Sequence, residues 1–136
     1  MRMAVDNAAS WQTRVPYSAR SAGTVRRWLA DVAGGVGDGL LEDLYAVATE
    51  LIGNAVRHAS PLAGDELSIR CRLSTGEVEF SVTDGGSAGT PAIRSVDHAS
   101  PDGRGLHIVN ALTSTWGVTD NGEGRTVWAR FDRAAA

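Results

Sequence analysis

The spacing of hydrophobic residues predicts two helices in the first half of the chain. Between Ser21 and Ala33 large apolar residues recur every three or four positions, as they do along one face of a helix. Glycines follow this stretch, Asp38 is expected to cap a second helix, and Ser60-Pro61 is expected to end it. This second helix, from Leu40 to Ala59, carries a longer apolar stripe made of Leu44, Val47, Ala48, Leu51 and Ala55.

Strict alternation of apolar and polar residues predicts strands further along the chain. The alternation runs from Leu67 to Leu73 and from Val78 to Val82, with a turn at residues 74–76, and it is typical of a sheet with one buried face. A short strand at Thr13–Tyr17 would lie at a sheet edge because Pro16 cannot donate a ladder hydrogen bond. A C-terminal hairpin is expected from Thr115–Val118, a turn near Asn121-Gly122, and Arg125–Phe131.

Between the predicted strands lies a long segment, from Asp84 to Asp102, that is rich in glycine, proline and serine. It exceeds the usual length of a connection, which favours a functional loop. A short helix at Leu106–Leu112 follows it. The order of elements predicts an α+β fold, a two-layer α/β sandwich in which helices cover one face of a mixed, mostly antiparallel sheet. Residues 1–10 are expected to be a flexible N-terminus and residues 11–133 one domain.

Composition narrows the classes of function. The chain has 136 residues, 43% of them hydrophobic, and a formal net charge of -3, so bulk charge favours neither a direct nucleic-acid partner nor a membrane partner. All 13 basic residues are arginine, which excludes a P-loop because that motif needs a lysine. Cys71 is the only cysteine, so an intrachain disulfide is excluded. With no signal-like or membrane-spanning apolar run, we expect a cytoplasmic protein.

Three polar residues of the long predicted helix form the first candidate site. Glu50, Asn54 and His58 are four residues apart, so they lie along one strip that borders the apolar stripe. Polar groups at the margin of a buried face usually line a cleft or pair with a neighbour. The alternative is a solvated helix edge with incidental polar residues.

Two glycine-containing segments form further candidates. Asp84 ends a predicted buried strand and is followed by Gly85 and Gly86, so its carboxylate could accept a hydrogen bond from an amine while glycine admits a flat ring. The alternative is an ordinary turn after a strand. Gly103-Arg104-Gly105 precedes a predicted helix, whose free amides would attract an anion, although such a short motif is also frequent by chance.

In this order, these motifs resemble the GHKL or Bergerat-fold ATPases over about Trp11 to Phe131. Glu50-x-x-x-Asn54 is similar to the N box of that family, Asp84-x-Gly86 to its first glycine box, and Gly103-x-Gly105 to its second. Thr126 stands where the family has a last-strand threonine near adenine, and the ATP lid would be about residues 85–102. The sequence departs from the family at Ala88, where the first glycine box usually has its next glycine.

Within that superfamily, the run around Glu50, Asn54 and His58 is most similar to small anti-sigma-factor serine kinases. The resemblance implies that Asp84, with Gly86 and Thr126, holds the adenine of ATP or ADP. It implies that Asn54 holds Mg²⁺ and that Glu50 is the general base. The phosphates would meet backbone amides near Gly105 and Leu106, the arginines Arg104 and Arg26, and His58, which alternatively packs the helix.

The resemblance therefore implies an ATP-binding regulatory protein, an anti-sigma-factor-like serine kinase. Such a protein sequesters a sigma factor and phosphorylates an antagonist of the anti-anti-sigma type, and it is compatible with a homodimer. The alternative is a non-catalytic ATP-binding module that regulates a transcription or signalling partner. A sensor histidine kinase is the least favoured reading, because the sequence shows no dimerisation helix with a phospho-accepting histidine.

Overall fold

The computed structural model describes residues 8–86, 101–120, 122 and 124–133. Its strands are β1 (Ala9–Pro16), β2 (Glu66–Ser74), β3 (Glu77–Asp84), β4 (Thr115–Asp120) and β5 (Arg125–Asp132). Its α-helices are α1 (Ser21–Ala33), α2 (Asp38–His58) and α3 (Pro101–Leu112), and a 3₁₀ turn, η1 (Gly34–Val36), joins the first two. Within the described residues, no helix is long and apolar enough to cross a membrane.

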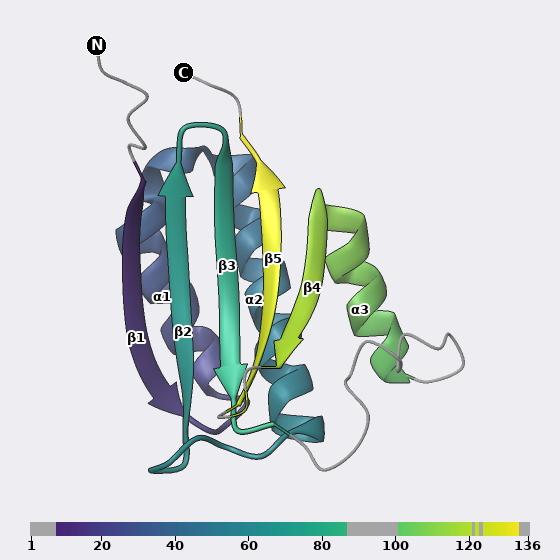
Figure 1. Cartoon of the computed structure of the whole chain (residues 1–136). Helices are drawn as coiled ribbons and strands as arrows, with labels where there is room; N and C mark the ends of the chain where they lie inside the picture. The colour runs from purple at the N-terminus through teal and green to yellow at the C-terminus, as the bar shows by residue number, and fades with distance from the viewer. Residues whose placement is uncertain (1–7, 87–100, 121, 123, 134–136) are drawn as a thin grey trace.

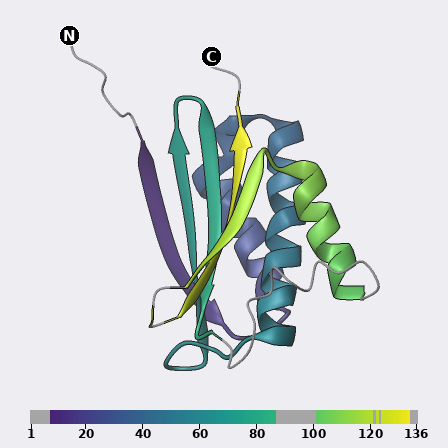
Figure 2. The same cartoon turned by 45° about the vertical axis from the view of Figure 1, so that its right-hand side comes forward.

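The strands form one sheet with the order β1-β2-β3-β5-β4, and α1 and α2 pack on one face of it (Figure 1). The view in Figure 2 shows α3 beside α2, near the β4 edge. The predicted α+β two-layer sandwich is therefore confirmed. The sheet was expected to be mixed, but each pairing between its described strands is antiparallel.

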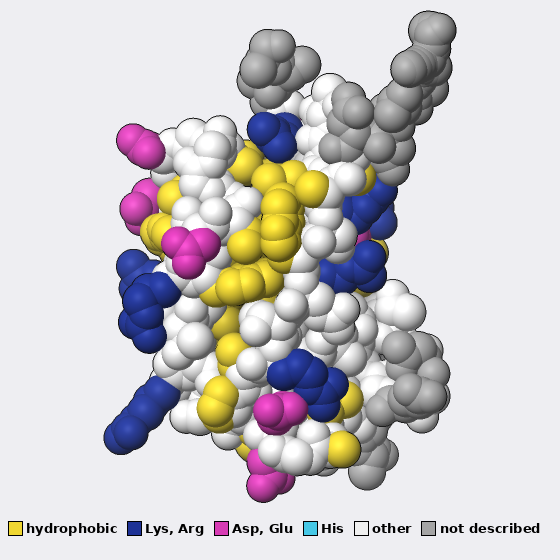
Figure 3. Space-filling model, turned by 90° about the vertical axis from the view of Figure 1, so that its left-hand side faces the viewer, with side chains coloured by type: hydrophobic (Ala, Val, Ile, Leu, Met, Phe, Trp, Pro, Cys, Tyr) yellow, Lys and Arg dark blue, Asp and Glu magenta, His cyan; other side chains and the backbone are white. Residues whose placement is uncertain are grey.

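The core lies between the helices and the sheet because the predicted apolar stripes and alternations face each other there. Its largest fully buried side chains include Leu29 of α1, Leu51 of α2, Phe80 of β3 and Phe131 of β5. Cys71 of β2 is also buried, and burial raises the pKa of its thiol to about 12. On the side where β1 lies, hydrophobic side chains form a band across the surface, flanked by arginine and acidic side chains (Figure 3).

The boundaries of three elements differ from the predictions. Strand β1 begins at Ala9, so residues 9 and 10 belong to the sheet instead of a flexible terminus, paired with β2. The N-cap of α2 is Gly37, whose φ of 106° favours glycine, and Asp38 is the first helical residue. Helix α3 begins at Pro101, not Leu106, because proline suits the first turn of a helix. Residues 1–7 lie outside the described part.

Candidate functional site

A buried carboxylate ends the central strand β3. Asp84 continues the alternation of Val78, Phe80 and Val82, so its side chain points to the core side, and it is fully buried. The pairing of β3 with β5 sets Arg125 directly opposite. Arg125 Nη2 donates to Asp84 Oδ2 at 3.0 Å, and the Gly86 amide donates to Asp84 Oδ1 at 2.7 Å. Both carboxylate oxygens therefore have partners.

The electrostatics of this pair depend on its burial. Burial raises the pKa of Asp84 above its ordinary value of 3.8, while the Gly86 amide and the Arg125 guanidinium act in the opposite direction. The side chains of Arg125 and Asp84 are 3% and 0% exposed, so water cannot screen their attraction. Arg125 thus offsets the cost of holding a charged acceptor in this position.

Two glycines allow the backbone to close around Asp84. A Cβ added at Gly85 would lie 2.3 Å from the Pro61 carbonyl oxygen, and one added at Gly124 would lie 2.3 Å from the Asp84 carbonyl oxygen. Any side chain at either position would collide with backbone. The Gly85 amide also donates to the Ser60 carbonyl at 2.7 Å. These contacts join the end of β3 to the segment that follows α2.

On α2, one turn before that segment, an asparagine has unused hydrogen-bonding capacity. Asn54 is only 3% exposed, and neither its Oδ1 nor its Nδ2 has a partner within the described part of the chain. A buried amide without partners costs free energy, and such groups in native proteins usually mark a site for water, an ion or a ligand. The carbonyl oxygen of Asn54 is a ligand type that Mg²⁺ accepts, together with waters and phosphate oxygens.

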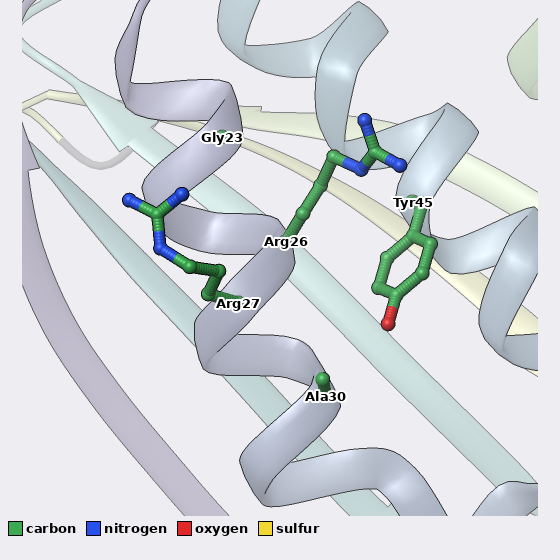
Figure 4. Close-up of a pocket in the computed structure, with 5 residues that line it drawn as sticks. All are labelled: Gly23, Arg26, Arg27, Ala30 and Tyr45. Atoms are coloured by element: carbon green, nitrogen blue, oxygen red, sulfur yellow. The ribbon is translucent and has the colours of Figure 1, made fainter.

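Further towards the N-terminus of α2, a charged cleft opens between the three helices. Its volume is about 270 Å³, and it includes Arg26 of α1, Glu50 of α2 and Ile108 of α3. Tyr45 joins this cleft to a second hollow between α1 and α2 (Figure 4), and the Arg26 guanidinium lies 5.1 Å from the centre of its ring. Arg27 lines only the second hollow, so Arg26 is the arginine that shares a cleft with Glu50.

Glu50 and Asn54 follow one another along α2, and the end of this helix leads to Asp84. At 1.5 Å per residue, Glu50 and Asn54 are separated by about 6 Å along the helix axis. The end of α2 adjoins the segment that holds Asp84, because the Ser60 amide donates to the Gly86 carbonyl at 2.8 Å. The result is a row from a buried carboxylate, past an amide without a partner among the described residues, to a cleft lined by the basic Arg26 and by the acidic Glu42 and Glu50.

The sequence model of the histidine kinase-like ATPase domain matches residues 15–131. The chain belongs to this family. Membership implies nucleotide binding. The fold is also similar to a solved structure of the RsbU and RsbW domains of Rv1364c from Mycobacterium tuberculosis, with a TM-score of 0.67 and 21% identity. That match covers 93% of this chain and 33% of the other. No curated protein matched the sequence.

Thr126 does not reach Asp84 in this histidine kinase-like ATPase domain. Its hydroxyl lies 2.7 Å from that of Thr83, on the sheet face opposite to the one that Asp84 and Arg125 share. Thr126 and Asp84 therefore lie on opposite faces of the sheet, and the expected contact of Thr126 with adenine stays a prediction. The alternation of β5 held the missing signal, since Arg125 has the same parity as the buried Val127, Ala129 and Phe131, and a buried arginine needs a partner.

The expected phosphate site at the start of α3 also changes. Because α3 begins at Pro101, Gly105 and Leu106 lie in its second turn, where helical geometry directs their amides to carbonyls four residues earlier. The free amides of this helix are those of its first turn. The Leu106 side chain is buried. The Arg104 side chain and the expected lid residues 87–100, with Ala88, lie outside the described part.

His58 lies at the opposite end of the polar strip from the cleft. It is the last residue of α2 and its side chain is exposed, so it does not pack in the core. Two helical turns, about 12 Å along the axis, separate it from Glu50. A basic side chain in the last turn interacts favourably with the helix dipole. The structure therefore brings Arg26 of α1 and Glu50 of α2 into one cleft, with Asn54 about one turn further along α2, while His58 remains at the Asp84 end.

Proposed function

We propose that this domain binds Mg-ATP along α2 and acts as an anti-sigma-factor-like serine protein kinase. The adenine would lie at Asp84 and Gly86, and the triphosphate would extend past Asn54 to the cleft of Glu50 and Arg26. The observation that carries this proposal is the buried Asn54 amide without a partner, placed between a buried carboxylate and a charged cleft. A carboxylate for the base, an amide oxygen for the metal and a charged cleft for the phosphates would then follow one another along a bound nucleotide.

The residues at the phosphate end would divide their tasks by chemistry. Asn54 Oδ1 would ligate Mg²⁺, which bridges phosphate oxygens and neutralises their charge when bound. Arg26 would add positive charge at the far phosphate, and its position over Tyr45 holds the guanidinium at the cleft. Arg104 and the first-turn amides of α3 remain proposed phosphate contacts.

Glu50 would act as the general base. It is half-buried and lines the cleft, within reach of a serine presented from outside. Its carboxylate would take the proton of the serine hydroxyl while the serine oxygen bonds to the γ-phosphorus. The bond from that phosphorus to the bridging oxygen breaks, and ADP leaves with the electron pair.

The proposed protein partners follow the resemblance. A sigma factor would be sequestered, an antagonist of the anti-anti-sigma type would supply the serine, and a second copy of the chain could form a homodimer. The solved structure with the similar fold combines RsbU and RsbW domains, which fits a role among regulatory proteins. The proposed compartment is the cytoplasm, where ATP is available.

Labelled ATP and candidate antagonist proteins test the kinase proposal. We expect phosphoserine to form on one antagonist and Glu50→Gln to lower the rate about 10²–10⁴-fold, the usual contribution of a general base. Glu42→Gln is the matched control because Glu42 lines the same cleft about two turns closer to the N-terminus of α2. Bound ATP without transfer to any antagonist, or equal losses in the two variants, would count against Glu50 as the base.

A non-catalytic ATP-binding module is the second candidate. The observation that favours it is the ion pair that already occupies Asp84, together with the absence of lysine to neutralise phosphate. Nucleotide titrations with and without Mg²⁺, repeated with Asn54→Ala, distinguish the two candidates. Binding that depends on neither the metal nor Asn54 would contradict the metal-bridged arrangement.

A further inference from the structure

Arg125 has more hydrogen-bonding capacity than its ion pair uses. The residue is 2% exposed, and Nη2 donates to Asp84 Oδ2 at 3.0 Å. Its Nε, also buried, has no partner within the described residues. A guanidinium carries five N–H donors in one plane, and a buried donor without an acceptor costs free energy. The arginine therefore has a donor left for a group that enters beside Asp84.

Building on the proposed function, we propose that Arg125 reads the base of the nucleotide together with Asp84. The Arg125 guanidinium donates a hydrogen bond to the ring nitrogen N1 of adenine, and Asp84 accepts one from the exocyclic amine. An acceptor and a donor side by side match an adenine edge, as the amides of asparagine and glutamine do in nucleic-acid recognition. Arg125 thus determines base specificity, in addition to neutralising Asp84.

The strand pairing fixes this acceptor and donor relative to each other. Arg125 and Asp84 are direct partners in the β3–β5 register, and Gly124 keeps the two backbones in contact. Side chains held by paired strands and by an ion pair lose little freedom when a ligand binds. A lysine in place of Arg125 would offer a point charge and no planar set of donors.

Two nucleotides that differ at one atom test the inference with the unchanged protein. In 1-deaza-ATP a C–H group replaces N1, so Arg125 would lose its acceptor while the amine and the phosphates remain. With Mg²⁺ present, calorimetry should show the analogue binding roughly tenfold weaker than ATP or worse, because the lost bond has a charged donor. Equal affinities would overturn the inference. Failure of ATP itself to bind would overturn the proposed function as well.

A pair of arginine variants assigns the effect to Arg125. In Arg125→Met the two nucleotides should bind with equal affinity. In the control Arg130→Met the preference for ATP should persist, because Arg130 lies on the other face of β5, over Trp128. If Arg125→Met retains the preference, Arg125 is only a counterion for Asp84. If Arg125→Met does not fold, Arg125→Lys replaces it and should show a reduced preference.

Discussion

The two ends of the proposed nucleotide site differ in how far their polar groups are already hydrogen-bonded. We call Asp84 and Arg125 the base end, and Asn54, Glu50 and Arg26 the phosphate end. At the base end, Asp84 and Arg125 are buried and bonded to each other, and the Gly86 amide occupies the second carboxylate oxygen. At the phosphate end, both polar atoms of Asn54 lack a partner among the described residues, and Arg26 is exposed at a cleft.

The difference follows from the elements that carry each end. Paired strands set the base end, so its acceptor and donor are assembled without any ligand. Helical side chains set the phosphate end, where hydrogen-bonding capacity remains for phosphate and metal. Substitutions at the base end should therefore reduce stability, whereas substitutions at the phosphate end should leave stability unchanged or raise it, and should weaken ligand binding.

The largest effect on stability is expected from breaking the base-end pair. Arg125→Met should lower the free energy of unfolding by about 3–5 kcal/mol, because it leaves a buried carboxylate without its counterion. The double variant Asp84→Leu/Arg125→Met should recover most of the loss. Urea unfolding followed by circular dichroism measures both. A loss of less than about 1 kcal/mol for Arg125→Met would show that the base end contributes no more to stability than the phosphate end does.

At the phosphate end, a substitution should change the free energy of unfolding in the opposite direction. Asn54→Leu should raise the free energy of unfolding by about 1–3 kcal/mol, because it removes a buried amide that has no partner. The same variant should remove the Mg²⁺ dependence of ATP binding. Asn110→Leu is the control, since Asn110 is exposed on α3 and accepts a hydrogen bond from Trp116. A destabilised Asn54→Leu protein would show that the amide has a structural partner.

The base end should also make stability depend on pH, because its carboxyl group, Asp84, is buried. Burial raises the pKa of Asp84 above 3.8, so between its unfolded and folded pKa values the native state binds more protons than the unfolded state. This contribution to stability is fully present below the unfolded pKa and is lost as pH rises through the folded pKa, at roughly 1.4 kcal/mol per pKa unit. Unfolding of the native chain and of Asp84→Leu/Arg125→Met, compared from acid to neutral pH, measures it. If the difference in the free energy of unfolding between the two proteins does not change with pH, the raised pKa of Asp84 would be contradicted.

The smallest effect is expected on the sheet face opposite the site. Thr126→Val should change the affinity for ATP by less than about twofold, because its hydroxyl contacts Thr83 and not Asp84. Its free energy of unfolding should fall by about 0.5–1.5 kcal/mol for the lost hydrogen bond. Nucleotide titration and urea unfolding measure the two quantities. A large loss of affinity for ATP in Thr126→Val would show that Thr126 contributes to nucleotide binding.

Most elements could be predicted because their signal is local. The apolar stripe of α2 and the alternation in β2 and β3 each need only one segment of chain to be recognised. The start of α3 was missed because its first five residues include two glycines and show little apolar periodicity. Ala9 and Ser10 were missed because their strand depends on pairing with β2 and not on their own preferences.

The sequence by itself determined the α+β architecture and the presence of Glu50, Asn54 and Asp84 in motif order, since periodicity and spacing are properties of the chain alone. Only the tertiary structure decided that Arg125, and not Thr126, meets Asp84, and that Arg26, and not Arg27, shares a cleft with Glu50. Those choices depend on strand register and helix packing, where a shift of one residue moves a side chain to another face. That register exists only when distant segments pair.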